Sequence, residues 1–371
     1  MSVLELPGRI AALPADARAR VDRLFRVEVA EGTAAPPPEM HNWLRQQFGS
    51  VEAVERQSVV RITNRWTLDG SLFSPLRGRR PVQNGRSRTW EEQVAGTRGD
   101  PFCDPEHRTP ADAWGRVRGR HMISGANAAM YDAHHGVLVF NEHDPLAFGR
   151  EQVVEMLHVG REWAERSRAK DPEAANYLLI WNCGPRAGGS VVHGHAQVLL
   201  GRGAHYPQVE RLRRDAASYA AATGGDYLTD LVACHRELGL VVSEAYGVTT
   251  YASLTPVKER ELVVTGPPGM DEREDAFAGA VAGLVLAARD VLGMRAFNLA
   301  LHRPPLGRKS ADGWERIGPI VHLVDRGDPG STASDIGAME LYGASVVGGD
   351  PFDISKRLRD AGTAGGPSAA G

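Results

Sequence analysis

The order of predicted secondary-structure elements repeats along the chain, and this repeat constrains the fold more than any other feature. The first copy predicts a strand, a helix and two more strands, over residues 135–140, 151–168, 176–181 and 191–200. The second copy predicts the same order, over residues 260–264, 271–292, 297–302 and 320–326. Two copies of strand–helix–strand–strand predict an α+β fold of duplicated halves, in which helices flank an antiparallel sheet.

The repeat divides the 371-residue chain into five predicted parts. They are an N-terminal extension (1–90), a catalytic half (91–205), a helical connector (206–248), a degenerate half (249–360) and a disordered tail (361–371). Within the extension, whose role the sequence does not indicate, the pattern predicts a short amphipathic helix over residues 18–29. The second half has Val324 where the first has His195, so only the first half can perform chemistry that needs this histidine.

Composition excludes several classes of function. With 43 basic and 46 acidic residues the formal net charge is −3, which offers no basic surface to nucleic acid. No apolar run reaches the roughly 18 residues that a membrane span needs. The first residues lack the pattern of a secretory signal, and the three cysteines, Cys103, Cys183 and Cys234, do not form a disulfide framework. We therefore expect a cytoplasmic protein that acts neither on nucleic acid nor in a membrane.

The most informative stretch of the chain runs from Asn182 to Gln197. Because side chains alternate along a strand, His193, His195 and Gln197 are predicted to share one face. Three neighbouring polar groups are costly in a core unless they are paired. The glycine-rich loop before them can bring main-chain N–H groups close to an anion, so the stretch favours phosphoryl chemistry with a histidine nucleophile. The alternative is a polar edge strand with surface histidines.

This stretch resembles the galactose-1-phosphate uridylyltransferase branch of the histidine-triad (HIT-like) superfamily. That branch has an Asn, a Gly-rich loop that ends in Ser, and then His-Pro-His-X-Gln, and the matching residues here are Asn182, Ser190, His193, His195 and Gln197. Gly194 stands where the branch has Pro. Three further segments agree with the branch: Asp100-Pro-Phe-Cys103, Phe140-Asn-Glu-His143 and the C-terminal residues 336–359. The resemblance covers roughly residues 100–360.

The resemblance implies a role for each matching residue. His195 is implied to attack the α-phosphorus of a nucleotide and to form a covalent nucleotidyl-histidine. Gln197 is implied to donate a hydrogen bond to the phosphoryl oxygen. The remaining implied contacts to substrate are a phosphate cradle of Ser190, Gly188 and Gly189, Asn182 near the leaving phosphates, Asn127 on the nucleoside wall and Glu340 at the sugar hydroxyls.

The resemblance also implies the type of reaction. Histidine-triad hydrolases have a third His where the transferase and phosphorylase branch has Gln, so Gln197 favours transfer to a phosphate-bearing acceptor over hydrolysis. The donor is a nucleotide of uridine or adenine type, no organic cofactor is expected, and a homodimer is implied. Met339-Glu340 stands where the branch has Tyr-Glu, which disfavours galactose 1-phosphate. Two alternatives stay open: a HIT-like hydrolase of a nucleotide conjugate, and an inactive nucleotide-binding or scaffold protein.

A structural zinc site is the last implication of the resemblance. Members of the branch that bind zinc use two Cys, a later His and the first His of the motif. The matching residues are Asp100, Cys103, His143 and His193, which make an Asp-Cys-His-His tetrahedron. The alternative is that Cys103 is a small apolar residue. His134 and His135 are expected to be surface or structural residues.

Overall fold

The largest element of the computed structural model, which describes residues 2–79, 88–307, 313–331 and 336–362, is a nine-stranded sheet. All of its neighbouring strands are antiparallel. In spatial order they are β4 (Met122–Ala126), β5 (His134–Phe140), β7 (His195–Arg202), β6 (Ala174–Cys183), β11 (Phe297–His302), β12 (Ile320–Asp325), β10 (Leu262–Thr265), β9 (Val248–Ala252) and β8 (Val241–Ala245).

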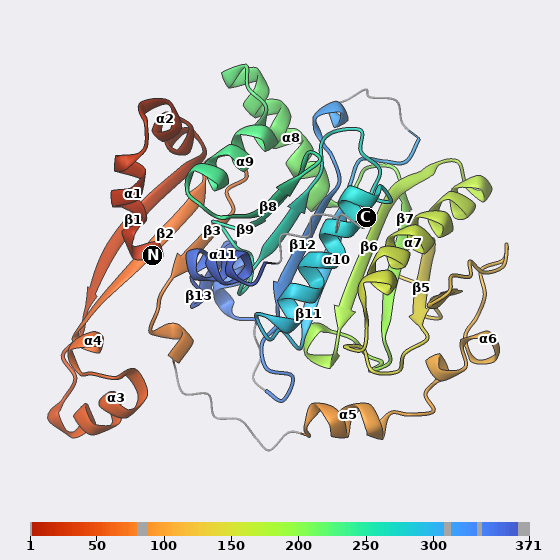
Figure 1. Ribbon diagram of the computed structural model, residues 1–371, viewed down its shortest axis with the longest axis horizontal. Helices are drawn as coiled ribbons and strands as arrows, with labels where there is room; N and C mark the ends of the chain where they lie inside the picture. Colours follow the sequence, from red (N-terminus) through yellow and green to blue (C-terminus); the bar gives the residue numbers. More distant parts are fainter. Residues whose placement is uncertain (1, 80–87, 308–312, 332–335, 363–371) are drawn as a thin grey trace.

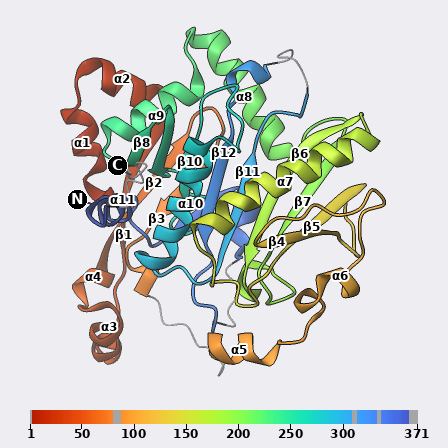
Figure 2. The same ribbon diagram turned by 45° about the vertical axis from the view of Figure 1, so that its right-hand side comes forward.

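The sheet is built from two copies of one unit that meet at its centre, where β6 pairs with β11. Outward from this seam, β7 and β5 in one half correspond to β12 and β10 in the other. Helices α7 (Arg150–Lys170) and α10 (Asp275–Asp290) occupy equivalent places and cover the same face (Figures 1 and 2). The predicted α+β fold of duplicated halves is confirmed, while the five predicted boundaries stay predictions.

The main hydrophobic core lies between the sheet and these two helices. Strand β6 sends Leu179, Trp181 and Cys183 into this core, whereas Ile180 and Asn182 lie on the opposite face. Gly136 in β5 permits a close approach of helix α7, because a Cβ atom there would come within 2.7 Å of the indole ring of Trp163. The alternation along β6 therefore leaves one face of the sheet apolar and the other available for polar side chains.

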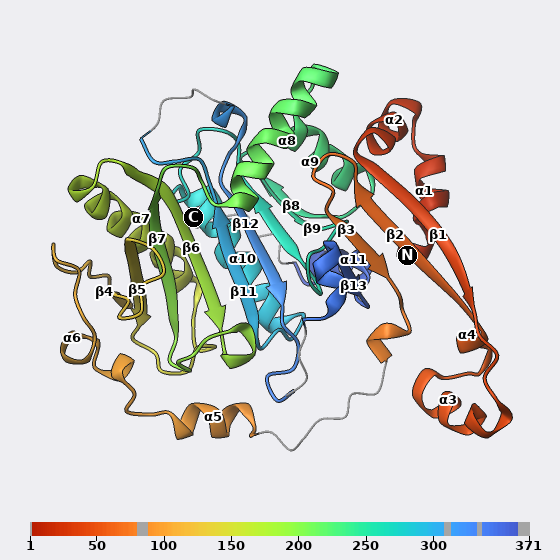
Figure 3. The same ribbon diagram turned by 180° about the vertical axis from the view of Figure 1, so that it is seen from behind.

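The second face of the sheet differs between the two halves. Over the second half, α8 (Pro207–Thr223) and α9 (Tyr227–Glu237) pack on it, with Leu212 and Leu228 against Val263 and Ile320. Seen from behind, β6 and β7 show this face with none of the described helices in front of them (Figure 3). Over β5 and β7 this face is covered instead by Phe102, which packs against Val137 and Val139.

A four-stranded sheet forms the second layer of structure. Strands β1 (Phe25–Thr33), β2 (Arg56–Asn64) and β3 (Gly70–Phe73) are antiparallel, and β13 (Ala344–Val347) joins β3 in parallel. The helix predicted over residues 18–29 is only partly present, because α2 (Ala15–Leu24) ends where β1 begins. Phe25 is buried, and the apolar alternation of Phe25, Val27 and Val29 suits a strand paired with β2 better than a helix.

The other described helices are short, and α1 and α11 contribute residues to the hydrophobic cores. Residues 41–55 form α3 (His41–Phe48) and α4 (Glu52–Glu55) at the far end of β1 and β2 (Figure 1). The rest are α1 (Leu6–Ala12), α5 (Trp90–Gly96), α6 (Pro105–Arg108) and α11 (Pro351–Asp360). Of the tail predicted over residues 361–371, residues 363–371 lie outside the described residues. None of the helices in the described part of the chain has the length and apolar character that crossing a membrane requires.

Candidate active site

His195 is the first residue of β7, the strand between β5 and β6. The register pairs Ile180 with Gln197 and Val139 with His195, so His195 and Gln197 lie on the face of the sheet that α7 does not cover. His195 is 6% exposed, and the ring of Phe102 lies edge-on to its imidazole at 5.0 Å. The structure therefore places a histidine and a glutamine side by side on one face of a buried strand, as predicted.

One hydrogen bond determines the protonation of His195. Its Nδ1 lies 2.8 Å from the main-chain oxygen of His193. A carbonyl oxygen can only accept, so Nδ1 carries the hydrogen and Nε2 keeps its lone pair. Burial lowers the pKa of His195, which favours the neutral ring. The side chain thus presents an unprotonated nitrogen, the form that a nucleophilic histidine needs.

The glycine-rich loop between β6 and β7 contains the 3-10 turn η5 (Pro185–Ala187) and turns at Gly188, which has φ of +89°. The N–H groups of Gly188 and Gly189 donate to the carbonyls of Pro185 and Gly184. Phosphate binding by these two amides would therefore require that they leave their bonds within the turn. Ser190 is exposed, so its hydroxyl is open to a ligand in the present arrangement.

Asn182 is joined to the second half of the molecule. Asn298 in β11 donates from Nδ2 to Asn182 Oδ1 and to the carbonyl of Ala187, each at 2.7 Å. Arg326 in turn donates to Asn298 Oδ1, and Arg186 donates to the carbonyl of Arg326 at 3.1 Å. Sequence reasoning missed Asn298 and Arg326, because their place beside Asn182 follows from the pairing of β6 with β11. Two arginines therefore lie next to the loop that is predicted to hold phosphate.

Two side chains contact the amide of Gln197, and a third contacts one of them. His135 Nε2 lies 2.8 Å from Gln197 Oε1, and the hydroxyl of Tyr131 donates to the same oxygen at 3.0 Å. Asn127 approaches His135 from another side, with Nδ2 at 3.0 Å from the same ring nitrogen. Asn127, the residue predicted for the nucleoside wall, is therefore a neighbour of Gln197 through His135. Tyr131 was not predicted, and no motif in the sequence indicates it.

Asp100, Cys103, His143 and His193 form a compact cluster, although they come from three separate segments of the chain. One ligand atom from each lies within 4.8 Å of all the others. The Nδ1 atoms of His143 and His193 are 3.1 Å apart, and Cys103 Sγ lies 3.3 Å and 3.6 Å from them. Four ligands on a tetrahedral zinc ion stand about 3.4 Å apart, given Zn–N bonds near 2.1 Å. The separations within the cluster therefore suit one ion.

The hydrogen-bond pattern of the cluster also suits a cation. His193 Nε2 donates to the carbonyl of Phe140 at 2.8 Å and His143 Nε2 to that of Val94 at 2.9 Å. In neutral rings both Nδ1 atoms then carry lone pairs, and these face each other. Asp100 Oδ2 is buried and has no hydrogen-bond partner in the described residues. Two facing lone pairs and a bare carboxylate oxygen repel each other unless a cation lies between them, so these residues fit a metal ion.

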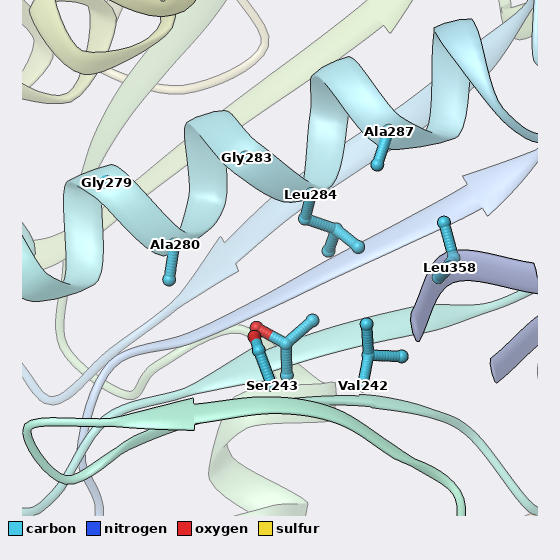
Figure 4. A pocket seen from close by; sticks show the side chains of 9 residues that line it. Val242, Ser243, Gly279, Ala280, Gly283, Leu284, Ala287 and Leu358 are labelled. Carbon is cyan, nitrogen blue, oxygen red and sulfur yellow. The ribbon is translucent and has the colours of Figure 1, made fainter. Parts of the chain in front are cut away.

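Glu340 lies in the 3-10 turn η7 (Ala338–Tyr342), next to β13 of the four-stranded sheet, and forms an ion pair with Lys258. The structure thus does not bring Glu340 together with His195. The described residues of the second half also line cavities. A gap of about 10 Å³ between α10 and the β8–β9 hairpin, lined by residues such as Ala280 and Leu284 (Figure 4), is too small to hold a substrate.

The second cavity, of about 330 Å³, lies under α8 and α9 and is lined by residues that include His302, His322 and Asn298. His322 Nδ1 lies 2.8 Å from Glu261 Oε1, so the histidine donates to a buried carboxylate. This cavity shares the face of the sheet that carries His195, but it lies in the half where Val324 replaces the nucleophile.

No protein-family model and no curated protein sequence matches the chain. Solved structures do match it. ADP-glucose phosphorylase from Arabidopsis thaliana, solved with bound ADP-glucose, has a TM-score of 0.61 and 17% identity over 78% of this chain and 95% of that chain. A GalT-like protein from Arabidopsis thaliana has a TM-score of 0.57 and 17% identity, over 71% and 92%. A uridylyltransferase has a TM-score of 0.56 and 17% identity, over 82% and 98%.

These superpositions define the class of fold: the chain shares the fold of nucleotide-sugar phosphorylase and uridylyltransferase structures, with its duplicated nine-stranded sheet. In particular, its fold is that of the ADP-glucose phosphorylase, the GalT-like protein and the uridylyltransferase, which agrees with the resemblance around His195.

Proposed function

We propose that the protein is a nucleotidyltransferase or nucleotide phosphorylase that works through a covalent nucleotidyl-histidine at His195. The observation that carries the proposal is the hydrogen bond from His195 Nδ1 to the carbonyl of His193, which leaves Nε2 unprotonated. A buried neutral imidazole with a fixed tautomer is prepared to attack phosphorus without a separate general base. The fold, shared with a phosphorylase and a uridylyltransferase, agrees with this type of reaction.

The reaction proceeds in two steps, each a displacement at the α-phosphorus. In the first, His195 Nε2 forms a bond to the α-phosphorus of the donor, and the bond from that phosphorus to the leaving phosphate oxygen breaks. The hydrogen stays on Nδ1, where the His193 carbonyl stabilises the imidazolium that forms. In the second step, an oxygen of the phosphate-bearing acceptor attacks the same phosphorus, the P–N bond breaks, and His195 returns to its neutral form.

The neighbours of His195 take the roles that the branch assigns to them. The Gln197 amide donates to the non-bridging oxygen on which charge develops. Ser190 contacts the phosphate, and Asn182, held by Asn298, faces the leaving group. Gly188 and Gly189 let the loop turn close to the nucleotide, and Asn127 bounds the nucleoside.

Zinc would be held by Asp100, Cys103, His143 and His193. Bound there, it supplies structural order and takes no part in the transfer. His193 links this cluster to the reaction, since its carbonyl accepts from the nucleophile while its ring faces the cluster. The cluster therefore fixes the position of His195 relative to the loop.

For substrates we propose a nucleoside diphosphate sugar as donor and a phosphate-bearing acceptor, which includes inorganic phosphate. The phosphorylase that shares the fold was solved with ADP-glucose, which makes adenine and uridine donors the first to compare. Glu340 is engaged with Lys258, so its role at sugar hydroxyls requires that this ion pair opens. A cytoplasmic location and a homodimer complete the proposal.

The test is intact-mass measurement after mixing the protein with UDP-glucose, ADP-glucose, UTP or ATP and quenching at alkaline pH, where a phosphoramidate survives. We expect a gain of one nucleoside monophosphate with one donor, absent in His195→Gly and retained in His322→Gly, a matched change in the second half. Product analysis with and without phosphate then separates transfer from hydrolysis. An unmodified wild-type mass with every donor, together with no product, would contradict the proposal and favour an inactive binding protein.

A further inference from the structure

The side-chain amide of Gln197 has two ends with opposite properties. Its oxygen only accepts hydrogen bonds and its NH2 group only donates them. A phosphoryl oxygen needs a donor, so only one of the two orientations of this amide can stabilise the charge that develops on it. The two orientations have nearly the same shape, so neighbouring side chains must select between them.

Two neighbours meet the oxygen end of the amide. His135 Nε2 lies 2.8 Å from Gln197 Oε1 and the Tyr131 hydroxyl lies 3.0 Å from it. Burial raises the pKa of Tyr131, so this phenol keeps its hydrogen and donates it. When His135 and Tyr131 both donate to Oε1, the NH2 group of Gln197 faces away from these two side chains.

The tautomer of His135 agrees with this orientation. The main-chain N–H of Tyr131 donates to His135 Nδ1 at 3.4 Å, so the ring hydrogen belongs on Nε2, facing Gln197. His135 is fully buried, and burial lowers its pKa, which keeps the ring neutral. Asn127 favours the other tautomer, because the N–H of Ala129 donates to Asn127 Oδ1 and leaves Nδ2 facing His135 Nε2 at 3.0 Å. The contact of Nε2 with Gln197 Oε1 is shorter, at 2.8 Å, and one ring nitrogen cannot form both bonds. The opposite tautomer would accept from Asn127 and turn the NH2 group of Gln197 toward His135.

We propose that His135 and Tyr131 are positioning residues that hold the Gln197 amide with its NH2 group toward the phosphoryl group bound at His195. The inference rests on the proposed function, because it concerns the residue assigned to the phosphoryl oxygen. The proposal also explains why the polar side chain of His135 is fully buried, although it adds nothing to the apolar core.

The duplication provides an internal comparison. The position of the second half that corresponds to Gln197 is Arg326, and the segment before β10, residues 253–261, contains no histidine. Arg326 donates to Asn298 instead. The pair therefore occurs in the half that has the nucleophile and not in the half that lacks it.

The first experiment measures the rate of the first turnover, as adduct formation with ADP-glucose or UDP-glucose, in His135→Leu and Tyr131→Phe. We expect His135→Leu to lower this rate roughly 10- to 100-fold, because a misoriented donor loses most of its contribution. His135→Gln keeps a donor near the position of Nε2 and should restore most of the rate. His134→Leu is the matched control, since this adjacent histidine pairs with Asp171 instead, and it should react like the wild type.

A double-mutant cycle separates positioning from general structural damage. In a Gln197→Leu background, His135→Leu should lower the rate less than 2-fold further, because no amide remains to be held. A wild-type rate in His135→Leu, or an undiminished effect in the Gln197→Leu background, overturns the inference.

The second experiment does not depend on activity. In protein labelled with ¹⁵N-histidine, the His135 ring, identified by the signals lost in His135→Gln, should carry its hydrogen on Nε2, and its shifts should change in Gln197→Leu. A hydrogen on Nδ1 overturns the inference whatever the enzyme does. If wild-type protein forms no adduct while the Nε2–H form is found, the proposed function fails and the orientation of Gln197 stands.

Discussion

Asn298 Nδ2 lies 2.7 Å from Asn182 Oδ1, across the pair of strands where the two halves of the molecule meet. The second half thereby orients a residue of the half that contains His195, the proposed nucleophile. Arg326, also from the second half, donates to Asn298 and completes a chain of bonds that ends at the glycine-rich loop. Residues of the second half therefore contact the segment that contains the proposed site.

Replacing Asn298 tests this relationship. We expect Asn298→Ala to lower the rate of adduct formation roughly 10-fold, because Asn182 loses the bond that fixes its amide. The cost in folding free energy should be about 1 kcal/mol, as for other hydrogen bonds of this kind. The control is Asn176→Ala at the other end of β6, where the amide holds the carbonyls of Gly203 and Ala204. Equal rates for the two variants would contradict a role of Asn298 in the site.

Removing a metal ligand should alter both metal content and stability. We expect purified protein to contain close to one zinc per chain by mass spectrometry of its elements, and a chelator to lower its melting temperature. Cys103→Ala and His143→Ala should lose the metal, whereas His121→Ala, at a histidine paired with Glu151, should keep it. Metal-free wild-type protein with an unchanged melting point in chelator would instead assign Cys103 a simple packing role.

Gln197→His should shift the products from transfer toward hydrolysis. Histidine at this place can donate to the phosphoryl oxygen and also exchange a proton with water, which an amide cannot do. The measurement is the ratio of nucleoside monophosphate to transferred product at a fixed phosphate concentration. An unchanged ratio would show that Gln197 does not control the choice of acceptor.

The buried His235 should make the protein less stable in acid. Its Nδ1 donates to the carbonyl of Leu231 and its Nε2 accepts from the N–H of Leu254, so the folded state holds the neutral ring. Burial lowers its pKa from 6.5 to about 4. Between these values the unfolded chain takes up a proton that the folded chain does not, so stability falls as pH falls. The loss across the window is about 3 kcal/mol.

Urea unfolding at several pH values checks this prediction. His235→Gln has no proton to take up, so its free energy of unfolding should decline less than that of the wild type between pH 6.5 and 4. A variant that loses as much stability as the wild type over this window would assign the acid sensitivity to other groups.

The residues of the site that sequence could predict are those whose position follows from strand alternation within one segment. His195 and Gln197 share a face because they are two residues apart in β7, and their local spacing from Asn182 is sufficient to find them. His135 was expected to be structural, and its contact with Gln197 depends on the register of β5 against β7, which a single sequence does not determine. The same holds for Asn298, which reaches Asn182 only through the pairing of β6 with β11.

For the fold too, the local pattern predicted the elements but not how the strands pair. The strand–helix–strand–strand order indicates two equivalent units, but not that β6 and β11 join them into one sheet. The extension was the hardest part, because apolar residues near position 25 fit both helical and strand periodicity. Pairing of β1 with β2 decided between them, and such long-range contacts are absent from a local pattern.

Strand β13 gives the chain an unusual order of assembly. Its Val347 pairs with Phe73 of β3, so the four-stranded sheet receives one strand from a segment about 270 residues further along the chain. At translation rates of about 5–20 residues per second, β3 waits tens of seconds for this partner as an open edge. A nascent chain that stalls before residue 344 therefore exposes backbone groups ready to pair with another molecule. This edge of β3 is covered only after residues 344–347 have been synthesised.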